Sequence, residues 1–425
     1  MDFDKPVLFM TRPSIWAVFA IAITIVTVSV INTSTVSLFP TQRVVPGDSG
    51  SGAAKRSCAG FFRGGGAERA VTASIRDFGG IGDGRTSNTE AFRRALRDLE
   101  RFGDKGGSRL NVPEGRWVTG SFNLTSNFTL FLERGAVILG SQNEEEWPVI
   151  EPLPSYGRGR ERLGGRHISL IHGDFSRMFN VVIKGITILA PLNSPNTDGI
   201  DPDSSDHVCI EDCYIESGDD LVAVKSGWDQ YGIKMARPSS NIIIRNVSGT
   251  TPTCSGLGIG SEMSGGVANI VVEDLHVFNS AAGVRIKTDK GRGGYIRNIT
   301  ITNITMDRVK VPIRFSRGSN DHPDEEWNPK AIPKVKGILI SNVVSVDTGR
   351  APLLEGIEDM PFEDICLNNI TLLGLPSSVS WQCEFVLGAS ARVSPTPCPE
   401  LRMNGSSPLC LFSQESRRLY SSIAS

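Results

Sequence analysis

Charged residues whose types and spacing could perform acid–base chemistry are concentrated between residues 196 and 287. They lie in the segments Asn196-Thr197-Asp198, Ser217-Gly218-Asp219-Asp220 and Arg285-Ile286-Lys287. Crowded carboxylates raise one another's pKa, so one of them can keep its proton near the working pH while another stays ionised. Asp198, Asp219 and Asp220 are therefore a candidate set for general acid and general base catalysis.

The local sequence indicates how these side chains could share one face. Arg285 and Lys287 are two residues apart, so on a strand both point to the same side, which suits binding a carboxylate. Asp219 and Asp220 are adjacent and would point to opposite faces of a regular strand. The preceding Ser217-Gly218 indicates a turn or bulge that could let both face the same side. Each pattern alone also fits an ordinary loop, turn or solvated strand.

The elements that must position these residues repeat along the chain. Short apolar runs recur at intervals of 27 to 39 residues, often with Asn or His just before them. The runs are residues 181–183, 208–210, 242–244, 270–272, 299–301, 338–340 and 365–367. The intervals leave no room for a helix. Units with two or three short strands predict the coils of a parallel β-helix, an all-β solenoid whose stacked coils bury a common core.

Similar intervals separate the candidate residues. Asp198 and Asp219 are 21 positions apart, Asp220 and Ser255 are 35 apart, and Ser255 and Arg285 are 30 apart. In a stack of coils these residues would fall into one column on one outer face. Two other repeat folds are less favoured, because the leucine-rich-repeat pattern is absent and a propeller would need four longer strands per blade.

Residues 87–100 predict a helix that caps the open end of the solenoid. Thr86 or Ser87 could cap its N-terminus, with Glu90 as the capping-box partner of Ser87. An apolar stripe at helical spacing is formed by Ala91, Phe92, Ala95 and Leu99. The glycine cluster before the helix lacks the phosphate-loop pattern. We expect the β-helix domain to span residues 67–385, followed by a loosely ordered or disulfide-pinned tail at residues 386–425.

The order of these motifs resembles glycoside hydrolase family 28, the polygalacturonases. The resemblance covers residues 70–385 and includes Asn-Thr-Asp, Asp-Asp, a Gly-Ile-Gly-Ser segment and Arg-Ile-Lys. The segment at residues 78–92 resembles that family's N-terminal motif, and residues 152–161 and 259–267 resemble its plant members. The resemblance implies a right-handed parallel β-helix that hydrolyses α-1,4-galacturonosyl linkages of pectin with inversion, needing no metal and no other cofactor.

The resemblance also implies roles for the charged residues. Asp219 would be the general acid. Asp198 and Asp220 would hold and activate the water. Arg285 and Lys287 would bind galacturonate carboxylates.

Three further residues are expected to bind substrate, and one of them departs from the family pattern. They are Asn196, Ser255 and Gly256. The family usually has a His-Gly pair where this chain has Ser255-Gly256. That His is expected to tune the acid or contact substrate, so its replacement bears on rate, pH optimum and substrate.

Two other functions compete with hydrolysis. A wall-polysaccharide binding protein with a degenerate site would fit the serine at position 255. A pectate lyase shares the β-helix but would need a calcium-binding carboxylate cluster and an arginine base. The formal net charge of −2 argues against nucleic acid as a partner and means that a polyanionic substrate needs a local basic site. We expect a pectic polysaccharide as partner and a monomeric protein.

The N-terminal 42 residues predict export. Residues 13–42 carry no charge, and the apolar stretch 15–31 is 17 residues long, with Lys5 and Arg12 before it. It reads as an uncleaved signal anchor or a signal peptide, with a buried core helix as a third interpretation. Residues 43–66 then form a linker rich in Gly, Ser, Ala and Arg. We expect the domain to be secreted, or anchored by its first segment outside the cytosol.

Cysteines and glycosylation sequons agree with export. The even number of eight cysteines fits disulfides, and Cys209 and Cys213 could form a local bridge or be two core thiols. Eight sequons begin at Asn32, Asn123, Asn127, Asn246, Asn298, Asn303, Asn369 and Asn404. Several recur in the repeat, where the Asn could simply turn a coil.

Overall fold

A computed structural model describes residues 69–158, 165–173, 179–317, 321–376 and 379–401. The chain divides into two compact units, Met1–Lys55 and Arg56–Ser425. The described residues begin at residue 69 and all belong to the second unit, so the predicted anchor and the whole predicted linker lie outside them. In the described part, no helix is long and apolar enough to cross a membrane.

The N-terminal part consists of short paired strands. One parallel sheet joins β1 (Val71–Ser74), β3 (Ser108–Val112) and β6 (Phe128–Leu132), and a second joins β2 (Asp83–Ser87), β4 (Gly115–Thr119) and β7 (Ala136–Gly140). Strand β5 (Phe122–Leu124) pairs with β10 (Ile171–Gly173), and β8 (Val149–Ile150) pairs antiparallel with β9 (Arg166–His167). The described residues also include the short 3₁₀ segments η2 (Ile75–Phe78) and η3 (Glu144–Glu146) and, at the C-terminal end, η4 (Pro399–Leu401).

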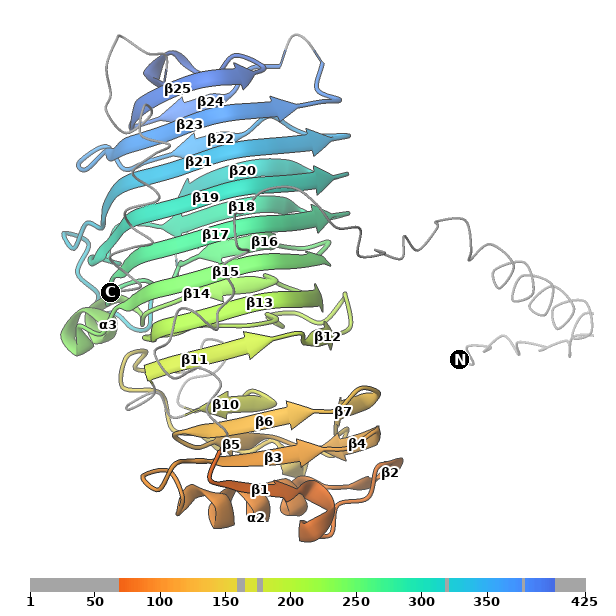
Figure 1. The fold of residues 1–425 in the computed structure, drawn as a ribbon. Helices are drawn as coiled ribbons and strands as arrows, with labels where there is room; N and C mark the ends of the chain where they lie inside the picture. The colour runs from red at the N-terminus through yellow and green to blue at the C-terminus, as the bar shows by residue number, and fades with distance from the viewer. Residues whose placement is uncertain (1–68, 159–164, 174–178, 318–320, 377–378, 402–425) are drawn as a thin grey trace, which may run out of the picture. The chain divides into compact units, whose positions relative to one another are not determined.

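Helix α2 (Thr89–Glu100) packs on these first coils and confirms the predicted capping helix (Figure 1). Its predicted apolar stripe is buried, and Phe92 stacks on Phe122 with ring centroids 4.6 Å apart. The predicted cap is wrong: the N-cap residue is Asn88, which makes no side-chain cap bond. The reason is that Ser87 is still part of strand β2, where it pairs with Val118. The helix therefore begins one residue later than a Ser87 cap would require.

Two long parallel sheets make up the rest of the domain. The nine-stranded sheet contains β11 (Phe179–Lys184), β12 (Thr187–Leu189), β13 (Asp206–Glu216), β15 (Ser239–Thr250), β17 (Val267–Phe278), β19 (Tyr295–Asp307), β21 (Lys334–Val346), β23 (Phe362–Leu372) and β25 (Val386–Ser394). The six-stranded sheet contains β14 (Val222–Val224), β16 (Ser255–Ile259), β18 (Ala282–Thr288), β20 (Val311–Arg317), β22 (Leu353–Glu355) and β24 (Gln382–Glu384). Helix α3 (Asp229–Met235) lies between β14 and β15 in sequence, so the expectation that the intervals leave no room for a helix is wrong for the 34-residue interval after residue 208.

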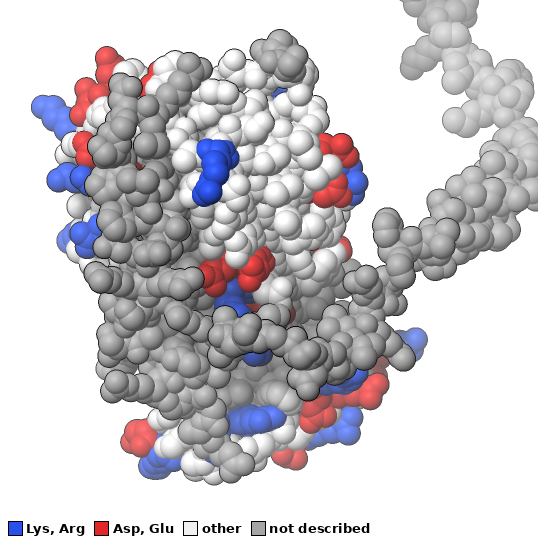
Figure 2. Space-filling view, turned by 45° about the horizontal axis from the view of Figure 1, so that its top comes forward, with Lys and Arg blue, Asp and Glu red and all other residues white. Residues whose placement is uncertain are grey.

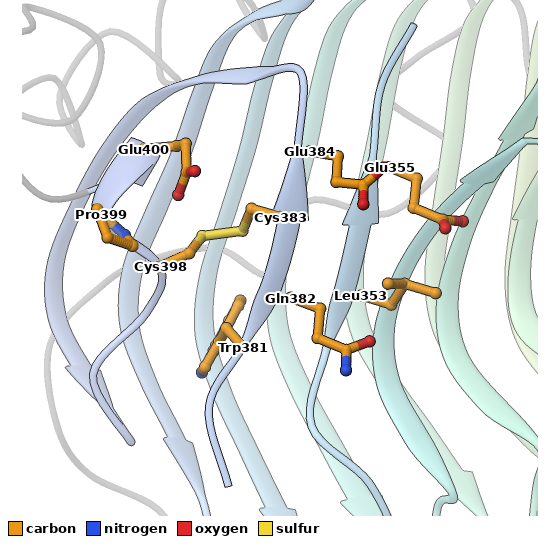
Figure 3. Close-up of a pocket in the computed structure, with 9 residues that line it drawn as sticks. All are labelled: Leu353, Glu355, Trp381, Gln382, Cys383, Glu384, Cys398, Pro399 and Glu400. Atoms are coloured by element: carbon orange, nitrogen blue, oxygen red, sulfur yellow. A yellow bond between two sulfur atoms is a disulfide. The ribbon is translucent and has the colours of Figure 1, made fainter.

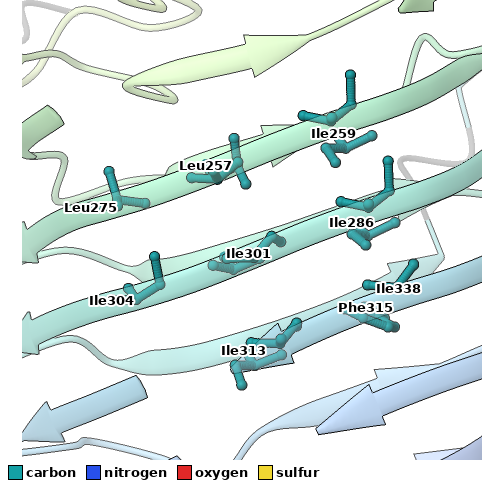
Figure 4. Close-up of a cluster of buried hydrophobic side chains, with 14 of the residues drawn as sticks. Leu257, Ile259, Leu275, Ile286, Ile301, Ile304, Ile313, Phe315 and Ile338 are labelled. Carbon is teal, nitrogen blue, oxygen red and sulfur yellow. The ribbon is translucent and has the colours of Figure 1, made fainter. Parts of the chain in front are cut away.

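The pairing register confirms the repeat that the apolar runs predict. The first residues of successive runs are Cα partners, for example Val208 with Ile242 and Ile242 with Ile270. Because side chains alternate along each strand, every coil sends one set inward. Figure 4 shows side chains of both long sheets, such as Ile286 and Ile301, meeting in one buried cluster. The chain is a parallel β-helix (Figure 1).

The nine-stranded sheet bends at two columns of residues with left-handed backbone. The first column contains Asn241, Asn269 and Asn298, with φ between 55° and 58°. Asn298 Nδ2 donates to Asn269 Oδ1 at 3.2 Å, and Asn269 Nδ2 donates to Asn241 Oδ1 at 3.1 Å. Asparagine tolerates this conformation better than other non-glycine residues. Each asparagine therefore turns its own coil and bonds to the next, an arrangement we call the asparagine ladder.

A second column lies five residues further along each coil. It contains Asp212, Asn246, Asp274, Asn303, Asn342 and Asn369, all with positive φ. Its hydrogen bonds include Asn342 Nδ2 to Asn303 Oδ1 at 3.2 Å and Asn369 Nδ2 to Asn342 Oδ1 at 2.8 Å. Four sequon asparagines belong to the two columns, namely Asn246, Asn298, Asn303 and Asn369. Their amide groups already bond within the fold, which supports the turn interpretation of these sequons.

The C-terminal end differs from the predicted boundary. Strand β25 pairs with β23, so the β-helix continues past residue 385. Its sequence is rich in small residues and lacks a Val/Ile run, which is why the repeat pattern missed it. A disulfide joins Cys383 to Cys398. Cys209 and Cys366 are also disulfide-bonded, whereas Cys213 is a free thiol, so the local bridge between Cys209 and Cys213 does not form.

Candidate active site

The strand register brings three predicted residues together on successive coils. Ile200 pairs with Val222, and Val222 pairs with Leu257. Counting back two residues along each coil gives Asp198, Asp220 and Ser255 as neighbours. The amide of Leu221 donates to Ser255 O at 2.9 Å, which fixes this alignment.

The bend predicted at Ser217-Gly218 is present between β13 and β14. Ser217 Oγ donates to the carbonyl oxygen of Asp219 at 2.7 Å and to that of Asp220 at 3.2 Å. The amide of Asp220 donates both to Asp219 Oδ1 at 2.9 Å and to Asp198 Oδ1 at 3.0 Å. One backbone N–H thus holds two carboxylates, and the three aspartates gather on one side of the chain.

Asp220 lies at the centre of the densest set of contacts. Lys287 Nζ lies 2.6 Å from Asp220 Oδ2, and both the amide and the hydroxyl of Ser255 donate to Asp220 Oδ1, the amide at 2.9 Å. Burial favours the protonated form of Asp220, whose side chain is only 1% exposed, but Lys287 and these hydrogen bonds outweigh it and lower its pKa to about 2. Asp220 is therefore an ionised carboxylate.

Gly258 leaves the space that Asp220 occupies. A Cβ on Gly258 would lie 2.5 Å from Asp220 Oδ2, closer than real Cβ contacts allow. Gly258 is on the outer face of β16, in register with Arg285 of β18. Because Gly258 has no side chain, the surface between the aspartates and Arg285 stays open.

Asp219 has the opposite electrostatic environment. Burial raises its pKa, and the negative charges of Asp198 and Asp220 raise it further. Asp219 is thus favoured to hold a proton directly beside a carboxylate that has lost one. Two neighbouring acids whose pKa values are pushed apart are the usual arrangement of a general acid and a general base.

Sequence reasoning missed Lys225 and Asp201. Lys225 Nζ lies 2.5 Å from Asp198 Oδ2 and 2.9 Å from Asp201 Oδ2. Burial opposes the charge of Lys225, but the carboxylates of Asp201 and Asp198 outweigh it and raise its pKa. The alternating Val-Ala-Val of β14 indicates that Lys225 points outward, but it does not indicate which carboxylates Lys225 meets.

Arg285 and Lys287 lie on the outer face of β18, as their spacing predicts. The intervening Ile286 is fully buried in the core. Arg285 Nη1 lies 3.8 Å from Sγ of Cys254, a free buried thiol that sequence reasoning treated only as a disulfide candidate. Burial, and then the Asp220 carboxylate, raises the pKa of Cys254, so the thiol stays neutral.

Asn196 and Gly256 lie outside this cluster of contacts. Asn196 is exposed on the loop before Asp198, with φ of 50°. Gly256 faces inward: a Cβ there would lie 2.3 Å from a methyl group of Val277. Packing therefore accounts for this glycine, and a part in substrate binding stays a prediction for both residues.

A metal ion is the remaining question of chemistry. Asp219, Asp220 and Cys254 each place one possible ligand atom within 4.8 Å of the others. Two carboxylates and a neutral thiol do not match the six to eight oxygens that calcium takes. The ammonium of Lys287 already pairs with Asp220. Figure 2 shows acidic and basic side chains together in one patch of a largely uncharged face, in agreement with such pairing.

These features define a β-helical protein with paired acid and base carboxylates beside a basic strand. The family model for glycosyl hydrolases family 28 matches residues 166–393. The chain is 42% identical over 414 residues to a probable polygalacturonase of Vitis vinifera, covering 82% of this chain and 84% of that one. The chain belongs to glycosyl hydrolases family 28.

Other relatives agree with this membership. A probable polygalacturonase of Arabidopsis thaliana is 28% identical over 387 residues, covering 77% of this chain and 80% of that protein. The exopolygalacturonase of Thermotoga maritima superposes with a TM-score of 0.61 and 26% identity, covering 76% of this chain and 91% of that one. The polygalacturonase of Erwinia carotovora has a TM-score of 0.52 at 21% identity, covering 75% and 96%, and supports the fold.

Proposed function

We propose that this chain hydrolyses α-1,4-galacturonosyl linkages of pectin or polygalacturonate in cell-wall metabolism. The observation that carries the proposal is the contrast between Asp219, whose pKa is raised, and Asp220, whose pKa is lowered to about 2. Arg285 and Lys287 add positive charge beside them, which suits a carboxylated sugar. Relatives named as probable polygalacturonases in Vitis vinifera and Arabidopsis thaliana support this substrate.

The proposed reaction is a single displacement. Asp219 gives its proton to the glycosidic oxygen of the leaving sugar as that bond breaks. Asp198 and Asp220 hold a water molecule, which attacks the anomeric carbon and passes a proton to one of them. Each turnover consumes one water and yields two chain ends, with inversion at the anomeric carbon as the family resemblance implies. The crowding that raises the pKa of Asp219 also keeps it ready to donate.

Ser255 bears on the alternative of a degenerate binding protein. The hydroxyl and amide of Ser255 both donate to Asp220, so the serine orients this carboxylate. All three aspartates keep charge-assisted or backbone contacts, and the basic strand is intact. The geometry therefore supports an enzyme more strongly than a binding module.

A pectate lyase is the other alternative. It would need calcium, whereas Asp220 pairs with Lys287 and Asp198 pairs with Lys225. We expect a chelator to leave the activity unchanged and the products to lack an unsaturated, ultraviolet-absorbing end. Loss of activity with chelator, together with an unsaturated product, would replace hydrolysis by elimination.

The test of hydrolysis is the release of reducing ends from polygalacturonate by the wild type and by Asp219→Asn. Removing a positioned general acid should lower kcat at least about 10²-fold. Asp98→Asn, an exposed aspartate on α2, is the matched control and should keep wild-type activity. Equal rates for Asp219→Asn and the wild type would refute the assignment of the acid.

We also propose that the domain is exported and acts as a monomer, secreted to the cell wall or held by its N-terminal segment as its only membrane contact. The Cys383–Cys398 disulfide and the bonded Cys209 and Cys366 support an oxidising compartment. In that compartment the sequon asparagine Asn123, which is exposed on β5, would be accessible for a glycan. Cell fractionation, with size-exclusion chromatography of the recovered protein, would check location and oligomeric state together.

A further inference from the structure

Arg314 extends the basic strand to the next coil. It lies on β20 directly in register with Arg285 of β18. Its neighbours Ile313 and Phe315 are fully buried in the core, so Arg314 points to the same outer face as Arg285. Adjacent strands are about 4.8 Å apart, which places two guanidinium groups on neighbouring coils of one face.

Neither guanidinium has a close counterion among the described residues, and the attraction of Glu355 for Arg314 is smaller than the repulsion from Arg285. The Nε atoms of Arg285 and Arg314 are both buried without a hydrogen-bond partner among the described residues. Within the described part of the chain, neither arginine forms a salt bridge, whereas Lys225 and Lys287 do. Burial, and then the like charge of Arg285, lowers the pKa of Arg314. Two partly desolvated cations side by side are unfavourable by themselves, and a bound anion would relieve both the repulsion and the missing hydrogen bonds.

The surroundings confine this positive charge to two coils. On one side Gly258 contributes no side chain, so the row stays open towards Asp220. On the other side Arg314 pairs in register with Leu353, and Leu353 pairs with Gln382, both uncharged.

A pocket of about 490 Å³ lies beyond Arg314, and its lining includes Leu353 and Gln382. Figure 3 shows Glu355 beside Glu384 on the next row of its lining, where their negative charge opposes a polyanion. Arg317 lies 3.7 Å from Glu384 and is already paired. The charge pattern therefore ends the favourable path for a carboxylated chain at Arg314.

We propose that Arg314 binds a second carboxylate of the uronate chain, one coil further from the aspartates than the carboxylate bound at Arg285. The proposal rests on the proposed function and deepens it, because it makes two neighbouring free carboxylates the feature that the enzyme recognises. A planar guanidinium suits this task, since it can donate two parallel hydrogen bonds to one carboxylate. Methyl esterification of the substrate would remove the charge that Arg314 recognises.

The test is calorimetric titration of oligogalacturonate into the Asp219→Asn protein, which blocks turnover. Adding Arg314→Gln should weaken the affinity about 10-fold, as expected for losing hydrogen bonds to a charged group. Adding Arg317→Gln instead is the matched control, because Arg317 is on the same strand and paired with Glu384, and should change affinity less than about 2-fold. With methyl-esterified oligomer of the same length, the effect of Arg314→Gln should disappear.

The outcomes separate the two proposals. Equal affinities for Arg314→Gln and Arg317→Gln, or an equal loss with esterified oligomer, would overturn the role of Arg314. Circular dichroism of each variant shows whether a loss comes from unfolding. If oligogalacturonate binds with the predicted dependence on Arg314 but the wild type does not hydrolyse it, hydrolysis fails and the Arg314 inference stands. If no variant binds oligogalacturonate, both proposals are overturned.

Discussion

The two long sheets of the β-helix stack coil on coil in the same way, but their columns of side chains differ in composition. On the nine-stranded sheet, the asparagine ladder repeats one residue type from coil to coil at Asn241, Asn269 and Asn298. On the outer face of the six-stranded sheet, no residue type runs through the whole column: Gly258 is followed by Arg285 and Arg314, and these by Leu353. A residue type that repeats in every coil therefore marks the structural turns of one sheet, whereas a column of changing residue types marks the candidate site on the other.

The physical reason lies in what stacks favourably on itself. A neutral amide has both a donor and an acceptor, so identical asparagines can bond in an unbroken column. Identical charges repel, so a column of them needs partners of the opposite sign or a ligand. The aspartates meet this need through Lys225 and Lys287, whereas Arg285 and Arg314 form no salt bridge with a described residue.

The largest effect within this comparison is expected for Lys287→Met. The substitution leaves Asp220 buried without its ammonium, so the pKa of Asp220 rises from about 2. Because a protonated Asp220 cannot accept a proton, the acidic limb of the pH profile of kcat/KM should move to higher pH. We expect kcat/KM on polygalacturonate to fall about 10²-fold, measured on samples shown to be folded.

The same substitution has a defined effect on stability. A folded-state pKa of about 2 lies below the unfolded value of about 3.9, so the ionised Asp220 stabilises the fold above the unfolded pKa. That contribution is lost as pH falls towards 2, and Lys287→Met should reduce it at all higher pH. The control is Lys336→Met on the nine-stranded sheet, whose exposed ammonium pairs with Glu363 at 3.4 Å. An unmoved acidic limb in Lys287→Met would show that Lys287 does not set the state of Asp220.

A smaller effect is expected for Ser255→Ala. It removes one hydroxyl bond to Asp220 and keeps both the amide bond and Lys287. The loss of one hydrogen bond to a charged group predicts about a 10-fold lower kcat and a smaller shift of the acidic limb than in Lys287→Met. Ser341→Ala removes a hydroxyl bond to Thr302 on the other sheet and should leave kcat unchanged. Equal losses in both variants would mean that the serine acts only through folding.

The contrast also explains what could be predicted from sequence. The apolar runs and the asparagines before them predict the coil period, and that period places Asp198, Asp220 and Ser255 on neighbouring coils, as the register confirms. The second column was predicted only in part: the recurring sequons indicated turns at Asn246, Asn303 and Asn369, but the aspartates Asp212 and Asp274 hid the continuous column. Strand β25 was missed for a related reason, since small residues hide its period.

The residues of the site that sequence reasoning missed are recognisable only by register. In the sequence, nothing distinguishes Lys225 from the other lysines. Its role is visible only in the structure, where its Nζ lies 2.5 Å from Asp198 Oδ2. Arg314 is 29 positions after Arg285, close to one coil, but no motif draws attention to it. Cys254 belonged to an even set of eight cysteines and was therefore interpreted as half of a possible disulfide. Chemistry that depends on pairing across coils needs the register of each strand, which apolar spacing alone does not fix.

The smallest effect on activity is expected at the asparagine ladder, where two substitutions at one position separate the two functions of the residue. Asn269→Gly removes the hydrogen bonds to Asn241 and from Asn298 but accepts φ of 58° freely. Asn269→Ala removes the same bonds and must also adopt left-handed backbone, which costs about 1–2 kcal/mol more. Chemical denaturation should therefore rank stability as wild type, then Gly, then Ala, with Ala about 3 kcal/mol below wild type.

Both Asn269 variants should keep wild-type kcat per folded molecule, because the ladder contacts none of the aspartates of the site. Asp219→Asn is the converse control, since it should abolish turnover without weakening the fold: Asp219 is held with a raised pKa, so a neutral amide replaces a group that is already disfavoured as an anion. A fall in kcat for folded Asn269→Ala would mean that the turns of the nine-stranded sheet set the positions of the aspartates. The stability of one sheet and the chemistry on the other would then not be independent.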